Sequence, residues 1–345
     1  MRLRPLLMLG MAALLVLTAC APEPAPSPTP TRSPAATPTS TPTPDPIVEP
    51  ETAFDVTCDD VAAEMAALVG EPTTAVSGTL SVVSSSNWTP GPMQYAFQRA
   101  GGIACSAGDH PRYWEVTMVP GADSVIAGAT ERQGYFGEQR RCENGFCAFE
   151  FPEGDVLLSA SITDPALGDD DADRVGAALG RLASAAAASI HDVEYVDSDI
   201  VGLPCERLIT PQQVAAAVGD DVKLFTDFGG WGIPAEVYQV VNGSRICYYT
   251  SGEGDLGSLA SYLGITTLPA GAWAFEHQGG EPEKVAGAVA AKASAGEHGE
   301  RILDVRVGSD WIRFTTYDNG SGASDPRPFA ETAVQNLTVG VTAPQ

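Results

Sequence analysis

Two cysteines with four residues between them form the sharpest chemical motif of the sequence, Cys142-Glu-Asn-Gly-Phe-Cys147. Asn144-Gly145 is the preferred pair for a two-residue type I′ hairpin, because both positions need positive φ. Glu143 and Phe146 would then pair beside the turn, and the cysteines would form the next pair, with Cα atoms about 4.5 Å apart. A disulfide accepts that separation, whereas a metal site would need two further ligands. The motif therefore predicts a hairpin closed by a disulfide.

Four more cysteines lie at corresponding places in two similar halves of the chain. Cys58 begins an Ala- and Val-rich segment that ends at Gly70, and Cys205 begins a similar segment that ends at Gly219. In each half a Trp follows, then a Tyr seven residues later, and then a cysteine nine or ten residues further on. The corresponding residues are Trp88, Tyr95 and Cys105 in the first half and Trp231, Tyr238 and Cys247 in the second. The spacing predicts an internal duplication, and it selects the disulfides Cys58–Cys105 and Cys205–Cys247 among the formal pairings.

The seventh cysteine, Cys20, ends an N-terminal apolar run. Two positive charges, Arg2 and Arg4, precede the run, and Leu17-Thr18-Ala19 leads into the cysteine. A charged start followed by a short apolar core is typical of an export signal, and about 15 apolar residues are too few for a membrane-spanning helix. Leu-Thr-Ala-Cys resembles the bacterial lipobox, which implies cleavage after Ala19 and diacylglyceryl transfer to Cys20. The sequence thus predicts a lipid anchor at Cys20 and residues 1–19 as signal peptide.

No catalytic spacing stands out in the sequence. It contains no Gly-x-Ser-x-Gly, Ser-x-x-Lys or His-Glu-x-x-His, and no phosphate loop or dinucleotide fingerprint. The four histidines, His110, His191, His277 and His298, stand in polar surroundings that favour exposure. We therefore expect no catalytic residues, no cofactor and no enzymatic activity.

An acidic run, Asp169-Asp170-Asp171-Ala172-Asp173, is similar in sequence to the start of a calcium-binding loop. The sixth position of such a loop needs Gly and the twelfth needs Glu, but the chain has Arg174 and Gly180 there. Acidic residues are also favourable at a helix N-terminus. We expect the helix start and no metal site.

The segment Phe225-Thr-Asp-Phe-Gly-Gly-Trp231 is the one loop whose composition suggests binding. Glycines around exposed aromatic rings can form a platform for sugars or peptides, which makes Phe228 and Trp231 candidate ligand-binding residues. Because Trp88 holds the matching place in the first half, packing of both tryptophans in the cores is the alternative and is favoured.

Charge and composition bound the partners. The chain carries 19 basic and 44 acidic residues, a formal charge of −25, which disfavours nucleic acid and anionic lipid headgroups. Residues 21–50 contain 11 of the 27 prolines and almost no large apolar side chain. Such a segment stays extended and disordered, so residues 20–50 are expected to be a spacer between the lipid and the folded chain. Composition leaves open whether this spacer is glycosylated.

Local signals place the helices and strands that must position these residues. Thr210-Pro211-Gln212-Gln213 is a capping box with Pro at the first helical position. Apolar residues at helical spacing predict further helices after Cys58, after Asp171 and after Asp325-Pro326, and Glu281-Pro282 suggests an extra one. Strands are expected at Gln94–Gln98, Arg112–Val119, Ala148–Phe151, Val156–Ile162, Val237–Val241, Arg245–Thr250, Ile302–Val307 and Trp311–Tyr317.

The order of these elements predicts an α+β fold with two similar domains, residues 51–195 and 196–345. Each would be an antiparallel sheet with flanking helices, stapled by disulfides. Six cysteines outside the anchor fit a compartment in which disulfides persist.

The lipobox, the Pro/Thr spacer and the Pro204-Cys205…Gly219…Cys247 pattern resemble actinobacterial cell-envelope lipoproteins of uncharacterised function. The resemblance implies location on the extracytoplasmic face of the cell membrane and carries over no catalytic residue. The expected function is a non-catalytic binding or sensor module with a cell-envelope protein or glycan partner. The alternatives are a structural or assembly factor of the cell wall and an unrecognised hydrolase.

Overall fold

The computed structural model describes residues 47–81, 90–225, 231–252, 260–320 and 323–342. Pro46–Gln345 forms one compact unit. The predictions for the signal peptide, Cys20, Trp88 and Phe228 lie outside the described residues, as does nearly all of the spacer.

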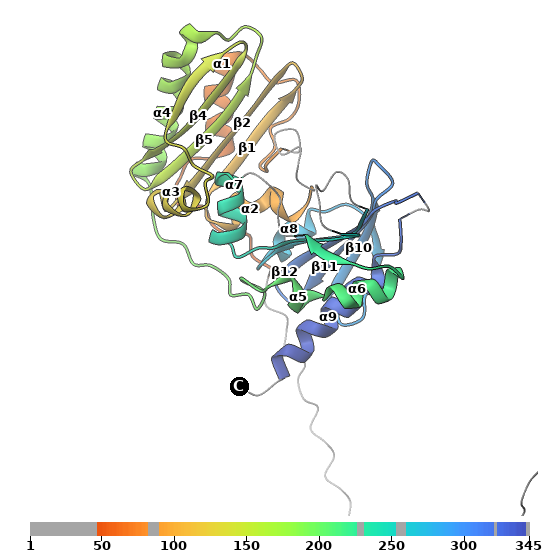
Figure 1. Ribbon diagram of the computed structural model, residues 1–345. Helices are drawn as coiled ribbons and strands as arrows, with labels where there is room; N and C mark the ends of the chain where they lie inside the picture. The colour runs from red at the N-terminus through yellow and green to blue at the C-terminus, as the bar shows by residue number, and fades with distance from the viewer. Residues whose placement is uncertain (1–46, 82–89, 226–230, 253–259, 321–322, 343–345) are drawn as a thin grey trace, which may run out of the picture. The chain divides into compact units, whose positions relative to one another are not determined.

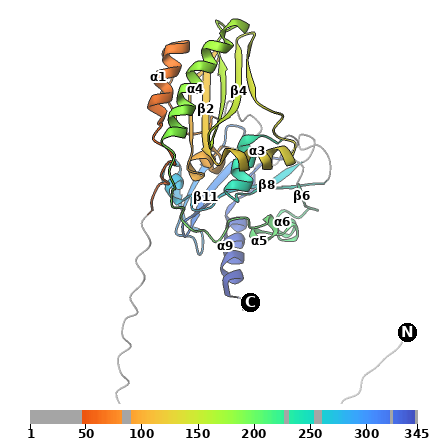
Figure 2. The same cartoon turned by 90° about the vertical axis from the view of Figure 1, so that its left-hand side faces the viewer.

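The first sheet is antiparallel and has the strand order β1-β2-β5-β4-β3. Its strands are β1 (Ile103–Asp109), β2 (Arg112–Pro120), β3 (Gln139–Glu143), β4 (Phe146–Glu153) and β5 (Val156–Thr163). Helices α1 (Cys58–Val69) and α4 (Ala172–Ala188) lie side by side on one face of this sheet (Figures 1 and 2). The short elements η1 (Pro92–Tyr95) and α2 (Ala96–Arg99) precede β1, and α3 (Ala122–Glu131) follows β2.

The second sheet is also antiparallel and has the order β6-β7-β8-β12-β11-β10-β9. Its strands are β6 (Lys223–Phe225), β7 (Ile246–Thr250), β8 (Ser261–Leu268), β9 (Glu281–Glu283), β10 (Ala290–Ala295), β11 (Arg301–Val307) and β12 (Asp310–Thr316). Helices α5 (Cys205–Leu208), α6 (Pro211–Val218) and α9 (Arg327–Thr342) pack on one face, with α5 against α9 (Figure 1). The remaining helical elements are α7 (Ile233–Glu236), η3 (Val237–Val241), α8 (Ala272–Glu276) and, in the first half, η2 (Asp169–Asp171).

The two sheets repeat one topology. Without its outer strands β6 and β9, the second sheet reads β7-β8-β12-β11-β10, which matches β1-β2-β5-β4-β3 strand for strand. The register agrees as well, because Cys105 pairs with Val116 in the first sheet and Cys247 pairs with Ile265 in the second. The α+β fold with two antiparallel sheets and flanking helices is therefore confirmed, and the matching order supports the duplication.

The predicted capping signals form as expected. The Thr210 side chain accepts from the Gln213 backbone N–H, the Gln213 side chain accepts from the Thr210 N–H, and Gly219 closes α6 in the left-handed conformation. Thr57 and Asp60 form a second capping box at α1. Asp171 accepts from the Gly168 N–H and pairs with Arg174, so the acidic run is used in the helix start that the sequence favoured.

Three short segments differ from the sequence prediction. Gln94–Gln98 was expected to be a strand but belongs to η1 and α2, where Met93 and Phe97 are buried at helical spacing. Val237–Val241 is likewise the π-helical turn η3, because Ile233 and Val237 bury one helical face. A short apolar run fits both the helical and the strand spacing of apolar residues, so the sequence alone does not decide between helix and strand.

The third difference concerns Glu281-Pro282, which was expected to begin a helix and instead forms the edge strand β9. An edge strand tolerates Pro because its missing N–H is not needed for the ladder.

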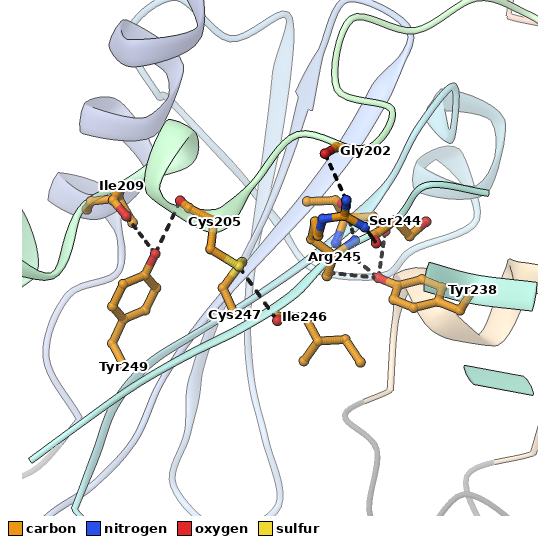
Figure 3. Close-up of a disulfide and its surroundings, with 10 residues drawn as sticks. Gly202, Cys205, Ile209, Tyr238, Ser244, Arg245, Ile246, Cys247 and Tyr249 are labelled. Atoms are coloured by element: carbon orange, nitrogen blue, oxygen red, sulfur yellow. Dashed lines mark hydrogen bonds between the residues drawn. A yellow bond between two sulfur atoms is a disulfide. The ribbon is translucent and has the colours of Figure 1, made fainter. Parts of the chain in front are cut away.

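All three predicted disulfides are confirmed. They join Cys58 to Cys105, Cys142 to Cys147 and Cys205 to Cys247. The first and third link the start of a helix to the first strand of the repeated unit, and the second closes the Asn144-Gly145 hairpin. Figure 3 shows the Cys205–Cys247 bridge, beside which the Tyr249 hydroxyl donates to the Ile209 carbonyl at 2.6 Å. Disulfides of this kind indicate a non-reducing environment.

Apolar side chains form three clusters. One lies under α1 and α4, and one lies under α5, α6 and α9. The third joins both halves and uses equivalent sheet positions, since Val119 and Leu157 of the first sheet correspond to Leu268 and Trp311 of the second. The division into domains 51–195 and 196–345 stays a prediction. Separating the two halves would expose this shared cluster.

Candidate functional site

The face of the first sheet opposite α1 and α4 is polar over most of its length. Strand alternation places Phe149 and Phe151 in the core, and Glu150 between them points to the other face. The same alternation brings further polar side chains to this face, here called the polar face: Ser106, Tyr113, Glu115, Thr117, Ser159, Ser161, Thr163, Gln139, Arg141 and Glu143.

One line of cross-strand neighbours crosses the polar face. Thr117 pairs with Ser159, Ser159 with Glu150, and Glu150 with Gln139. We call these four residues the first row. The Ser159 hydroxyl donates to Glu150 Oε2 at 3.2 Å. Burial raises the pKa of the Glu150 carboxyl, and the hydrogen bond from Ser159 opposes that rise only in part.

The second sheet carries the equivalent line, the second row: Thr266, Arg313, Asp304 and Lys292. Arg313 donates from Nε to Asp304 Oδ1 at 2.7 Å and from one terminal nitrogen to Oδ2 at 2.8 Å. Trp311 Nε1 donates to the same carboxylate at 2.7 Å. The pair is buried, with the Asp304 side chain 1% exposed. The second row therefore supplies its own cation to its carboxylate.

The first half contributes to the cover of the second row. The Pro90 carbonyl accepts from Arg313, and a Cβ on Gly91 would lie 2.6 Å from the guanidinium. Gln278, whose amide group also donates to Tyr95, accepts from Arg313 at 3.0 Å. The Arg313 guanidinium thus has hydrogen-bond partners in Pro90 and Gln278 as well as in Asp304.

A second carboxylate, Glu115, lies on the polar face two strands from Glu150. Its Oε2 accepts from the Ser81 N–H at 2.7 Å and from the Tyr113 hydroxyl at 3.2 Å. Two strand spacings separate the two glutamates by about 10 Å across the sheet, and each carboxylate has partners of its own. The arrangement suits recognition of ligand hydrogen-bond donors.

Trp231, one of the two sequence-predicted ligand residues, lies at the contact between the halves. Its Nε1 donates to Glu236 Oε2 at 2.9 Å, and Arg132 lies over its ring at 5.8 Å. Arg132 also pairs with Glu236 at 3.0 Å, and that carboxylate is 2% exposed. Trp231 is half-buried, so these contacts give it a packing role and leave part of its surface accessible.

The loop after α3 connects Trp231 to the first row. A Cβ on Gly134 would lie 2.5 Å from the Trp231 ring. The next residue, Tyr135, has a raised pKa because of burial and then the charge of Glu150. Phe136 follows and is 84% exposed, the largest exposed fraction among the large apolar side chains that the structure describes.

Sequence reasoning missed Glu150, Ser159 and Phe136. The alternation Ala148-Phe149-Glu150-Phe151 was a usable signal for Glu150, because a carboxylate between two core phenylalanines must face away from the core. The four histidines are exposed, as predicted, and within the described part of the chain no group of three or more metal-binding side chains occurs. A groove of about 690 Å³ between α1 and α4 is open to solvent and is crossed by the ion pair Arg181–Glu64.

A comparison of the chain with protein-family models, with curated proteins and with solved structures finds no match. Among the described residues no helix has the length and apolar character to span a membrane.

Proposed function

We propose that the protein is a non-catalytic binding module, anchored through Cys20 to the extracytoplasmic face of the cell membrane, whose ligand occupies the polar face of the first sheet. The observation that carries this proposal is Glu150, a half-buried carboxylate on a polar sheet face. At the equivalent position of the second sheet, the carboxylate of Asp304 is already satisfied by Arg313.

Three features support the location. The disulfides fit a non-reducing compartment. The Leu17-Thr18-Ala19-Cys20 motif provides an acylation site, and residues 21–50 provide a spacer of up to about 90 Å at 3.1 Å per residue. A folded unit on such a spacer can meet envelope ligands away from the bilayer surface.

The anchor is tested by fractionating cells that produce the wild-type chain or the Cys20→Ser variant. The wild type should sediment with membranes and yield an acylated N-terminal peptide beginning at Cys20. The variant should leave the membrane fraction. An unmodified Cys20 in the wild type contradicts the anchor.

Binding at the polar face is tested by site-specific photocrosslinking in living cells. A photoreactive residue at Ser161, on the polar face, should give a discrete crosslinked species. The matched control is Ser184, an exposed serine on α4. Equal crosslinking at both positions, or none at Ser161, would contradict a ligand site on the polar face, whatever the chemistry of the ligand.

A further inference from the structure

The two rows differ in one respect that bears on ligand chemistry. Both keep a carboxylate at the same register position, Glu150 in the first row and Asp304 in the second. The strand partner of Asp304 is Arg313, and the strand partner of Glu150 is Ser159. Both rows therefore contain the anion, whereas only the second row has the cation.

Glu150 forms no ion pair with an arginine or lysine among the described residues. Its hydrogen bond is with the neutral Ser159 hydroxyl. Arg141, which lies on the same face of the sheet, pairs with Glu143 at 2.7 Å. A half-buried carboxylate without a cation is electrostatically unfavourable, and a positively charged ligand group would relieve that cost. Gln139 takes the place of Lys292 at the next position of the row, so the row has no positive side chain of its own.

The loop after α3 carries two consecutive aromatic residues, Tyr135 and Phe136, of which Tyr135 lies near Glu150. Tyr135 is close enough to Glu150 for their charges to interact, and Phe136 exposes its ring to solvent. Aromatic faces attract cations, and a guanidinium group also stacks on them as a flat plate. Tyr135 therefore supplies an aromatic ring near the carboxylate, and the exposed Phe136 is the next residue of the same loop.

We propose that the first row binds a guanidinium group of the ligand, held by Glu150 as the Arg313 guanidinium is held by Asp304 in the second row. The inference rests on the proposed binding function and specifies its ligand. The planar fork of guanidinium matches a carboxylate through two parallel hydrogen bonds, which an ammonium group cannot form. Such a group can come from a small free molecule or from an arginine side chain within a peptide.

The test is a calorimetric titration of the chain from residue 20 onward, with Cys20→Ser and the disulfides formed. Agmatine represents a free small molecule, and Nα-acetyl-arginine N-methylamide represents a peptide side chain. The N-methylamide of Nα-acetyl-citrulline has nearly the same shape without the charge. We expect saturable binding of at least one guanidinium probe, at least tenfold tighter than binding of the citrulline compound.

Variants locate the binding. Glu150→Gln should weaken binding at least tenfold, because it removes the charged acceptor while keeping the shape. Ser159→Arg should abolish it by supplying the cation internally, as in the second row. Glu153→Gln, on the same strand but exposed and outside the row, should bind like the wild type. Near-ultraviolet circular dichroism checks that each variant is folded.

Three outcomes would overturn the inference. They are equal affinity for the arginine and citrulline probes, no binding of either guanidinium probe, and unchanged binding in folded Glu150→Gln. A crosslink at Ser161 would leave the proposed function in place in each of these cases, so the two failures are distinguishable.

Discussion

The unequal charge balance of the two rows predicts a large loss of stability for one substitution and almost none for the equivalent substitution in the other row. Asp304→Asn removes the charge from a carboxylate that is 1% exposed and receives two hydrogen bonds from Arg313. Breaking a buried ion pair from one side costs about 3–5 kcal/mol, because the remaining charge stays buried. Because Arg313 keeps its hydrogen bonds to Pro90 and Gln278, we expect Asp304→Asn to lower the unfolding free energy by about 3 kcal/mol, the lower end of that range.

Glu150→Gln removes the charge at the equivalent position of the first row. No cation of the described residues is left unpaired there, and the amide can still accept from Ser159. The unfolding free energy should therefore stay within about 1 kcal/mol of the wild type, as for most changes at partly exposed positions.

Urea unfolding at pH 7 with intact disulfides, followed by tryptophan fluorescence, measures both variants. The double variant Asp304→Leu with Arg313→Met controls for loss of the pair as a whole, and it should recover most of the stability because no charge remains unpaired. A loss below about 1 kcal/mol for Asp304→Asn, or an equal loss for Glu150→Gln, would refute this reading of the rows.

Three further predictions follow from the described contacts. Because burial raises the folded-state pKa of Glu150, the folded chain binds a proton more tightly there than the unfolded chain. The unfolding free energy of the wild type should consequently fall relative to that of Glu150→Gln as the pH rises from 4 through that raised pKa. A difference in urea midpoint between the two proteins that stays constant from pH 4 to 8 would contradict this prediction. Replacing both cysteines of the Cys58–Cys105 bridge by Ser should lower the unfolding free energy by about 4 kcal/mol, and the same change at Cys142–Cys147 by about 2 kcal/mol, because the closed loops differ in length. Equal losses of unfolding free energy in urea would argue against the loop-entropy account. Gly128→Ala should lower the melting temperature because its Cβ would lie 2.1 Å from the buried Glu236 carboxylate, whereas Gly180→Ala, which meets nothing within 4 Å, should raise or preserve it.

Local sequence signals predicted much of the fold. The Asn144-Gly145 hairpin, the capping box at Thr210 and the helix of Val175, Leu179 and Leu182 depend on neighbours within one or two turns, so short-range rules suffice. Short apolar runs such as Val237–Val241 fit a helix or a strand equally, and tertiary packing decides between them.

The candidate site required long-range pairing that no local pattern contains. Glu150 meets Ser159 only through the register of β4 and β5, and its likeness to Asp304 is visible only once both sheets are aligned by their strand order. The contact of Trp231 with Glu236 and Arg132 likewise depends on α3, a helix that the sequence analysis did not predict.

The most direct test of the account is the pKa of the Glu150 side-chain carboxyl, measured by carbon-detected nuclear magnetic resonance in the wild type and in Ser159→Arg. If the first row is a carboxylate site without its cation, the wild-type pKa lies above the ordinary value for glutamate because of burial, and the introduced arginine lowers it. An ordinary wild-type pKa that does not move in Ser159→Arg would contradict the equivalence of Glu150 and Asp304 on which the account rests.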